Sequence, residues 1–166
     1  VEEYLPTLML RYVGDSKSIK SRVRQHCTGN VESSALRKTI AMQMGFEIVS
    51  KKRESGSRKY SISQHDGEEF VSQYLQSGLW KTCVCQSADE ARDFQWYAID
   101  KKRPNLNKYM QFWDTNFEER YQIYLEHLIA EDGIEFQSIS TLDKSPGVYS
   151  LWHNMSPLDF ISMKKR

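Results

Sequence analysis

Short apolar segments indicate β-strands in the first third of the chain. Residues 8–13 are mostly apolar and end on a β-branched residue, and the turn-forming residues 14–16 follow them. Residues 46–49 and 59–62 flank a loop of serine and glycine, a pattern typical of a hairpin. We therefore expect a strand near the N-terminus and a hairpin after it.

The middle of the chain has the periodicity of helices. Apolar residues three to four positions apart predict one helix around residues 70–75. Ser87 and Glu90 have the form of a capping box, which predicts a second helix that runs through Ala98 and ends at residues 101–105, where Pro104 disfavours its continuation. An apolar stripe predicts a third helix over residues 117–130.

The remaining segments decide the fold class. Residues 34–44 fit a helix by composition but lead directly into a strand, and residues 135–140 and 148–152 return to a strand-like pattern. The order of strands, helices and strands argues for an α+β fold, with an antiparallel β-sheet packed on a helical bundle and a C-terminal hairpin. No linker-like stretch interrupts residues 1–166, so we expect a single domain.

Composition excludes several classes of protein. With 12% aromatic and 39% hydrophobic residues, the chain is too apolar for a disordered protein. No apolar run approaches the ~20 residues of a membrane span, and the three cysteines do not form a disulfide framework. Because the chain starts at Val1 without a methionine, we expect a piece of a longer protein.

The formal net charge of +1 conceals a strong asymmetry. Residues 1–61 carry 12 Lys and Arg against 6 Asp and Glu, whereas residues 62–140 carry 7 against 14. Such a split predicts a basic face and an acidic face on one domain.

No group of residues stands out as catalytic or metal-binding. Cys83 and Cys85 lie two positions apart among scattered histidines, whereas structural zinc sites use C-x₂₋₄-C with a second matched pair. The chain has no Walker-type glycine loop, G-x-S-x-G or H-E-x-x-H motif. We therefore expect no catalytic residue, no metal and no cofactor.

Two basic runs offer contacts to phosphate groups. Lys51-Lys52-Arg53 stands on one arm of the predicted hairpin and Arg58-Lys59 on the other, and residues 101–103 form a second run. A solvated loop explains either run as well as a nucleic-acid contact does.

Several short strings follow one another along nearly the whole chain: Thr28-Gly29-Asn30, Ile48-Val49-Ser50-Lys51-Lys52-Arg53, Arg58-Lys59, Leu106-Asn107, Gly133-Ile134-Glu135 and Asn154-Met155-Ser156-Pro157. In this order they resemble the cap-binding domain of the orthomyxovirus polymerase basic protein 2, in a form divergent from influenza and closer to the thogotoviruses. The resemblance implies a non-catalytic module of a viral RNA polymerase, used in cap-snatching during viral transcription.

The same resemblance implies a degenerate cap pocket. Lys59 and Phe46 match family pocket residues, and Lys38 stands for an arginine on the phosphate side. The positions of the two stacking rings fall at Ile40 and Cys85. The position of the guanine-reading glutamate falls at Met44.

Loss of these groups predicts weak or absent cap binding. Two missing rings alone would remove about 2–6 kcal/mol of stacking. We then expect polymerase subunits and viral or host RNA as partners, no membrane, a monomeric isolated domain, and a location in the host nucleus and virion. The alternatives are a working cap binder that uses other aromatic residues, a protein–protein interaction module and, with least support, a small enzyme.

Overall fold

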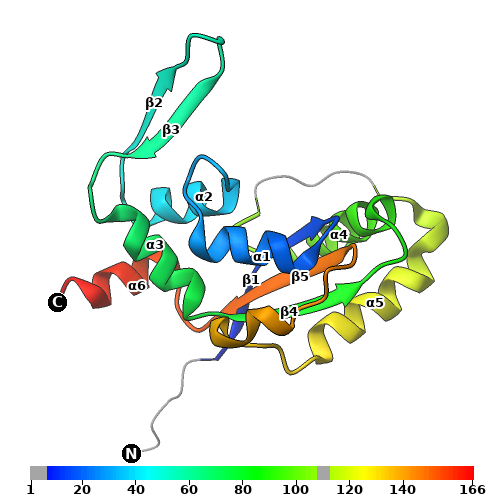
Figure 1. Cartoon of the computed structure of the whole chain (residues 1–166). Coiled ribbons are helices and arrows are strands. Elements are labelled where there is room, and N and C mark those ends of the chain that lie inside the picture. Colours follow the sequence, from blue (N-terminus) through cyan, green and yellow to red (C-terminus); the bar gives the residue numbers. More distant parts are fainter. Residues whose placement is uncertain (1–6, 108–112) are drawn as a thin grey trace, which may run out of the picture.

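The computed structural model describes residues 7–107 and 113–166. Helices and strands alternate irregularly along the chain (Figure 1). In chain order they are β1 Met9–Ser16, α1 Ile19–Thr28, α2 Ala35–Gln43, β2 Ile48–Lys52, β3 Arg58–Ile62, α3 Gly67–Gln76, β4 Leu79–Val84, α4 Ala88–Lys102, α5 Glu118–Ala130, β5 Gly147–His153 and α6 Pro157–Lys164, with 3-10 helices η1 Thr115–Phe117 and η2 Phe136–Thr141.

The main sheet joins the two ends of the chain. Its strand order is β1-β5-β4 and both pairings are antiparallel, so the late strand β5 lies in the middle. The edge strand β1 pairs Gly14 with Tyr149 and Ser16 with Gly147. Five of the seven β5 residues, Gly147 to Leu151, are buried in succession because this strand is covered on both faces.

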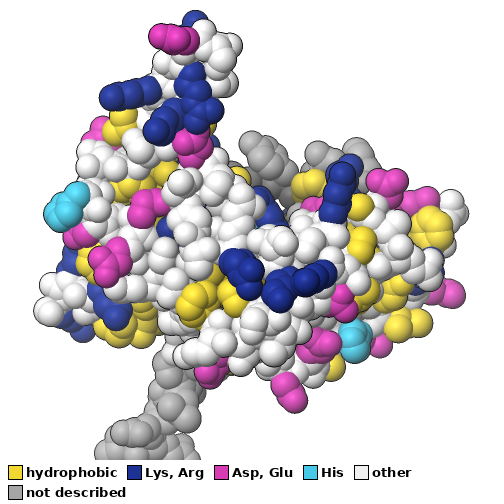
Figure 2. Space-filling model, in the orientation of Figure 1, with side chains coloured by type: hydrophobic (Ala, Val, Ile, Leu, Met, Phe, Trp, Pro, Cys, Tyr) yellow, Lys and Arg dark blue, Asp and Glu magenta, His cyan; other side chains and the backbone are white. Residues whose placement is uncertain are grey.

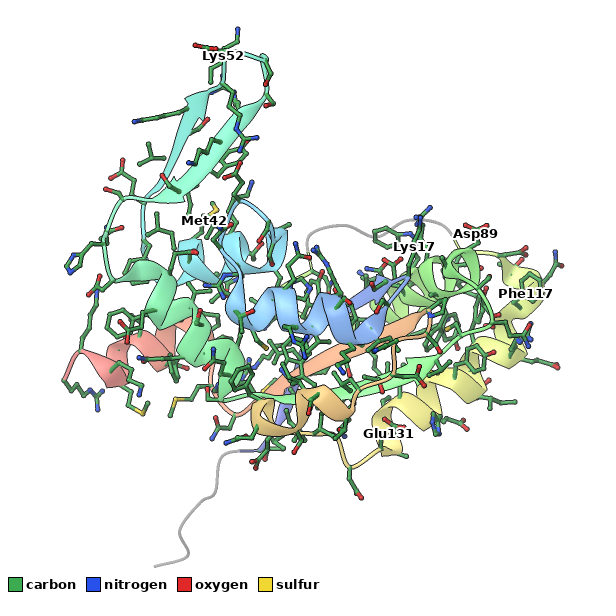
Figure 3. All side chains as sticks on the ribbon, in the orientation of Figure 1. Lys17, Met42, Lys52, Asp89, Phe117 and Glu131 are labelled. Atoms are coloured by element: carbon green, nitrogen blue, oxygen red, sulfur yellow. The ribbon has the colours of Figure 1, made fainter. Side chains whose placement is uncertain are left out.

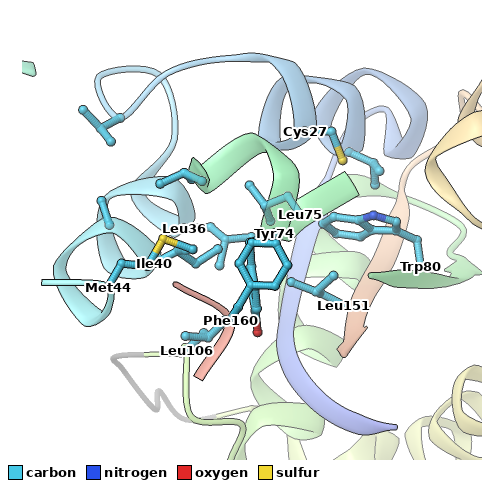
Figure 4. Packing of buried hydrophobic residues seen from close by; sticks show 14 of the residues in the cluster. Cys27, Leu36, Ile40, Met44, Tyr74, Leu75, Trp80, Leu106, Leu151 and Phe160 are labelled. Carbon is cyan, nitrogen blue, oxygen red and sulfur yellow. The ribbon is translucent and has the colours of Figure 1, made fainter. Parts of the chain in front are cut away.

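Helices cover both faces of this sheet. On one face, Tyr149, Leu151 and Trp80 pack with α1, α2 and α3, and Figure 4 shows part of this apolar cluster. On the other face, Val13 and Val148 pack with α4 and α5. The side chains of β5 alternate between these two clusters, as the pleat of a strand requires.

The strands β2 and β3 form a separate two-stranded sheet. This hairpin projects from the helical layer beside α2 and α3 (Figure 1). Its position leaves most of its length without a covering layer.

The α+β fold class with antiparallel sheets is confirmed. The predicted hairpin is β2 and β3, and the three predicted helices are α3, α4 and α5. The Ser87 half of the capping box is confirmed, because its hydroxyl accepts a hydrogen bond from the Glu90 amide at 3.1 Å. The Glu90 carboxylate reaches back one residue further than predicted and accepts from the Gln86 amide at 3.3 Å. The ambiguous residues 34–44 contain the helix α2, which Ser34 caps.

Other local predictions were wrong. Residues 135–140, predicted as a strand, lie largely in the 3-10 helix η2, and β5 pairs instead with β1 and β4. Residues 14–16 continue β1 rather than forming a turn. The helices α1 and α6 were not predicted; α1 is polar overall and buries only one narrow side. Among the described residues, no helix is both long and apolar enough to cross a membrane.

Candidate active site at the β1–β5 strand pair

Two tripeptides with mirrored sequences meet at the β1–β5 pair. Tyr12-Val13-Gly14 lies on β1 and Gly147-Val148-Tyr149 lies on β5. They are 133 positions apart in the chain when counted from Gly14 to Gly147, yet their strands are neighbours in the sheet (Figure 1), and the two tripeptides overlap at one pair, Gly14 opposite Tyr149.

Both glycines are required by close approach of neighbouring groups. A Cβ atom on Gly14 would lie 2.5 Å from Cζ of Tyr149 and still closer to its hydroxyl. A Cβ atom on Gly147 would lie 2.5 Å from Cδ1 of Ile19 and would also collide with the Cys83 carbonyl. Any larger residue at position 14 would therefore displace the Tyr149 phenol.

The Tyr149 phenol belongs to a buried hydrogen-bonded chain. Its hydroxyl lies 2.6 Å from Nε2 of His26, and Nδ1 of His26 lies 2.7 Å from the Ser34 hydroxyl. The Ser34 hydroxyl in turn accepts from the Arg37 amide at 3.1 Å. Helix α1 thus supplies the imidazole and the N-terminus of α2 fixes its second nitrogen, which holds the ring in one orientation.

Electrostatics set the protonation of this cluster. Burial lowers the pKa of His26 well below its usual value, and Arg22 and Arg37 lower it further, so the imidazole is neutral at pH 7. Burial also raises the pKa of Tyr149 and of Tyr12, although Arg22 opposes both shifts. Both phenols therefore keep their protons and can donate hydrogen bonds, with Arg22 as the permanent cation beside them.

Tyr12 connects this cluster to a cavity along the edge strand. The cavity holds about 140 Å³. Asn107 fixes the β1 edge there, because it accepts from the Val13 amide and donates to the Val13 carbonyl, both at 2.9 Å. Gln95 donates to the same carbonyl at 3.5 Å. The lining residues are Tyr12, Ala35, Leu36, Thr39, Gln95, Trp96, Leu106 and Asn107.

The donor set of this cavity does not fit a magnesium ion held by the protein. Proteins hold Mg²⁺ mainly through carboxylate oxygens. The lining offers the carboxamides of Gln95 and Asn107 but no carboxylate. Within residues 7–107 and 113–166, no three His, Cys, Asp or Glu side chains gather closely enough to hold a metal ion.

The site and fold define a small α+β domain with a tyrosine–histidine cluster at the edge of a central sheet. The family model for the GIY-YIG catalytic domain matches residues 5–124. The chain therefore belongs to the GIY-YIG catalytic domain family. No curated protein and no solved structure matches the chain.

The match covers Tyr12-Val13-Gly14, which differs from the Y-I-G of the family name only by valine for isoleucine. Arg22 and His26 also lie within the matched residues, whereas Tyr149 lies beyond them.

Family membership corrects the interpretation drawn from the sequence. The resemblance to a cap-binding domain of a viral polymerase was wrong, and so were the function, the keywords and the non-catalytic role that it implied. The matching strings were short, and strings such as Thr28-Gly29-Asn30 mark turns that unrelated folds share. The polymerase partners and the nuclear location rested on that resemblance alone, and nothing in the structure tests them.

The residues assigned to the cap pocket lie apart from this site. Ile40, Met44 and Phe46 are core side chains at 0%, 4% and 6% exposure, and Cys85 belongs to the cluster on the opposite face of the sheet. Lys59 is exposed on β3. Lys38 places its ammonium 4.1 Å from the centre of the Tyr60 ring. None of these six lines the cavity beside β1.

Sequence reasoning missed Tyr12, Arg22, His26 and Tyr149. One signal was available, because Arg22 and His26 are four positions apart and therefore share a helix face.

Proposed function

We propose that this chain is a nuclease that hydrolyses phosphodiester bonds of nucleic acid at the Tyr12 cavity. The observation that carries the proposal is the cluster that Tyr12 forms with the buried pair of His26 and Tyr149, in a chain of the GIY-YIG catalytic domain family.

Each polar group has a distinct part in this proposal. Tyr12 is half-buried and lines the cavity, so its phenol donates a hydrogen bond to a phosphate oxygen. Arg22 supplies the positive charge that opposes the charge developing on the phosphate during attack by water. The oxygen of water then bonds to phosphorus and the ester P–O bond breaks. The proton that the water loses passes through solvent to the leaving oxygen, which departs as a hydroxyl group.

His26 acts as a positioning residue in this scheme. It has no exposed surface and does not line the cavity, but its ring lies 5.9 Å, centre to centre, from the ring of Tyr12, which does. Because burial keeps the imidazole neutral, it orients the phenols rather than carrying charge.

A cleavage assay tests the proposal. The chain is incubated with supercoiled plasmid and with labelled DNA and RNA duplexes, in magnesium, in manganese and in a chelator. We expect nicks or cuts that Tyr12→Phe and Arg22→Gln reduce by at least tenfold. Intact substrates under every condition, or cleavage that both variants leave unchanged, would refute the assignment.

His26→Gln separates positioning from direct contact. We expect a fall in kcat with little change in KM, because the substrate does not touch the imidazole. A rise in KM with kcat unchanged would contradict the positioning role.

A further inference from the structure

The hairpin of β2 and β3, residues 48–62, forms an arm that pairs with no strand of the main sheet and contributes no residue to the cavity lining. Its outer residues 50–59 are all exposed, whereas Ile48, Tyr60 and Ile62 at its base pack against the core. Figure 1 shows the arm standing away from the helical layer, and Figure 3 places Lys52 at its far end. We call residues 48–62 the basic arm.

The basic arm concentrates positive charge. It carries five cations and a single acid, Glu54; the cations are Lys51, Lys52, Arg53, Arg58 and Lys59. Figure 2 shows the blue side chains of lysine and arginine gathered over this projection. Arg53 pairs with Glu32. Within the described part of the chain, no acid lies within ion-pair distance of the other four cations.

The register places like charges directly opposite one another. Lys51 pairs with Lys59, and Lys52 pairs with Arg58. Such pairs destabilise a hairpin, and an exposed two-stranded sheet has little apolar burial to offset the repulsion. A polyanion lying along the arm would remove this repulsion.

Double-stranded DNA matches the arm in size and charge. Strands of five residues extend about 17 Å at ~3.4 Å per residue, which spans several phosphates at ~3.4 Å of helix axis per strand. The major groove of B-DNA is wide enough, at about 12 Å, to admit a two-stranded ribbon. The major groove of A-form RNA is too deep and narrow to admit such a ribbon.

Helix α2 links the arm to the cavity. On one side, Lys38 of α2 contacts the Tyr60 ring at the base of the arm. On the other side, the α2 residues Ala35, Leu36 and Thr39 line the cavity beside β1. A duplex held by the arm would therefore approach the helix that borders the proposed site of cleavage.

We propose that the basic arm is a binding surface for the phosphate backbone of double-stranded DNA and holds the duplex beside the Tyr12 cavity. The choice of nucleic acid rests on the proposed nuclease function. The arm contributes affinity without sequence preference, because lysine contacts to phosphate carry no base information.

Salt-dependent binding tests the arm. Lys51→Gln, Lys52→Gln and Lys59→Gln are combined in one variant, and Lys144→Gln, Lys164→Gln and Lys165→Gln form a control that removes the same charge from exposed positions elsewhere. Fluorescence anisotropy with a labelled DNA duplex gives the affinity at several salt concentrations. A thermal melt of each variant verifies folding.

We expect the arm variant to lower the slope of log K against log salt by about three, and the affinity at 0.1 M salt by on the order of a hundredfold. The control should change either value much less. Equal losses in both variants, no DNA binding by the unmodified chain at low salt, or tighter binding to an RNA duplex would overturn the proposal.

Binding and cleavage can fail independently. Arm-dependent DNA binding without any cleavage would uphold the arm and refute the nuclease function. Cleavage that the arm variant leaves unchanged at subsaturating DNA would refute the arm and uphold the nuclease function.

Discussion

Replacement of Gly14 by alanine should displace the phenol at the centre of the site. The added Cβ would lie 2.5 Å from Cζ of Tyr149, about 1 Å inside the ordinary carbon–carbon contact of ~3.5 Å. Tyr149 is 1% exposed and packs against Trp80 and His26, so its ring has no free space to enter. The phenol must therefore leave Nε2 of His26.

The expected cost has two parts. Overpacking of a filled core costs about 1–3 kcal/mol. An unpaired buried nitrogen on His26 costs about 1–3 kcal/mol more. The total of about 2–6 kcal/mol should lower Tm by roughly 5–20 °C for a chain of this size.

Urea unfolding, followed by tryptophan fluorescence, measures this loss in Gly14→Ala, Tyr149→Leu and the double variant. If the clash is the cause, the two changes are less than additive, because leucine has no phenol to displace. A Gly14→Ala chain that melts with the unmodified protein, or a double variant whose cost equals the sum of the two single costs, would refute this account of the glycine.

Three further outcomes follow from buried or half-buried polar groups. Burial lowers the pKa of His153 to about 4. Because His153 binds a proton in the unfolded chain but not in the folded chain between pH 6.5 and about 4, the free energy of unfolding should fall by about 2 kcal/mol from this group as the pH drops from 7 to 5. His153→Gln should flatten the dependence of that free energy on pH, measured by urea unfolding, and an unchanged slope would contradict this. Glu68→Gln removes the carboxylate that lies 3.5 Å from the Arg37 guanidinium; because Glu68 is partly exposed and Arg37 keeps its bonds to the His26 carbonyl, the Glu68 carbonyl and Ser72, it should cost about 1 kcal/mol by chemical denaturation, and a loss above about 3 kcal/mol would contradict this. Gln95→Glu places a carboxylate in the cavity, so millimolar magnesium should raise its Tm and cleavage rate more than those of the unmodified chain, and an equal response of both chains would count against the cavity as a potential ion site.

Local sequence patterns determined the elements whose signals are complete within a few residues. The capping box at Ser87 identified α4, the apolar stripe over residues 117–130 identified α5, and turn residues between two short runs identified the basic arm. The α+β class followed from the order of these elements. In each case neighbouring residues supply the hydrogen bonds or the apolar face, so the pattern needs no distant partner.

Only the tertiary structure decided the candidate site. Tyr12 and Tyr149 come from opposite ends of the chain, and long-range pairing of β1 with β5 brings them together around His26. The same pairing made residues 148–152 the centre of the sheet rather than one arm of a terminal hairpin. Pairing of distant strands is selected by burial on both faces of the sheet, and that burial depends on helices from the whole chain, which no local pattern contains.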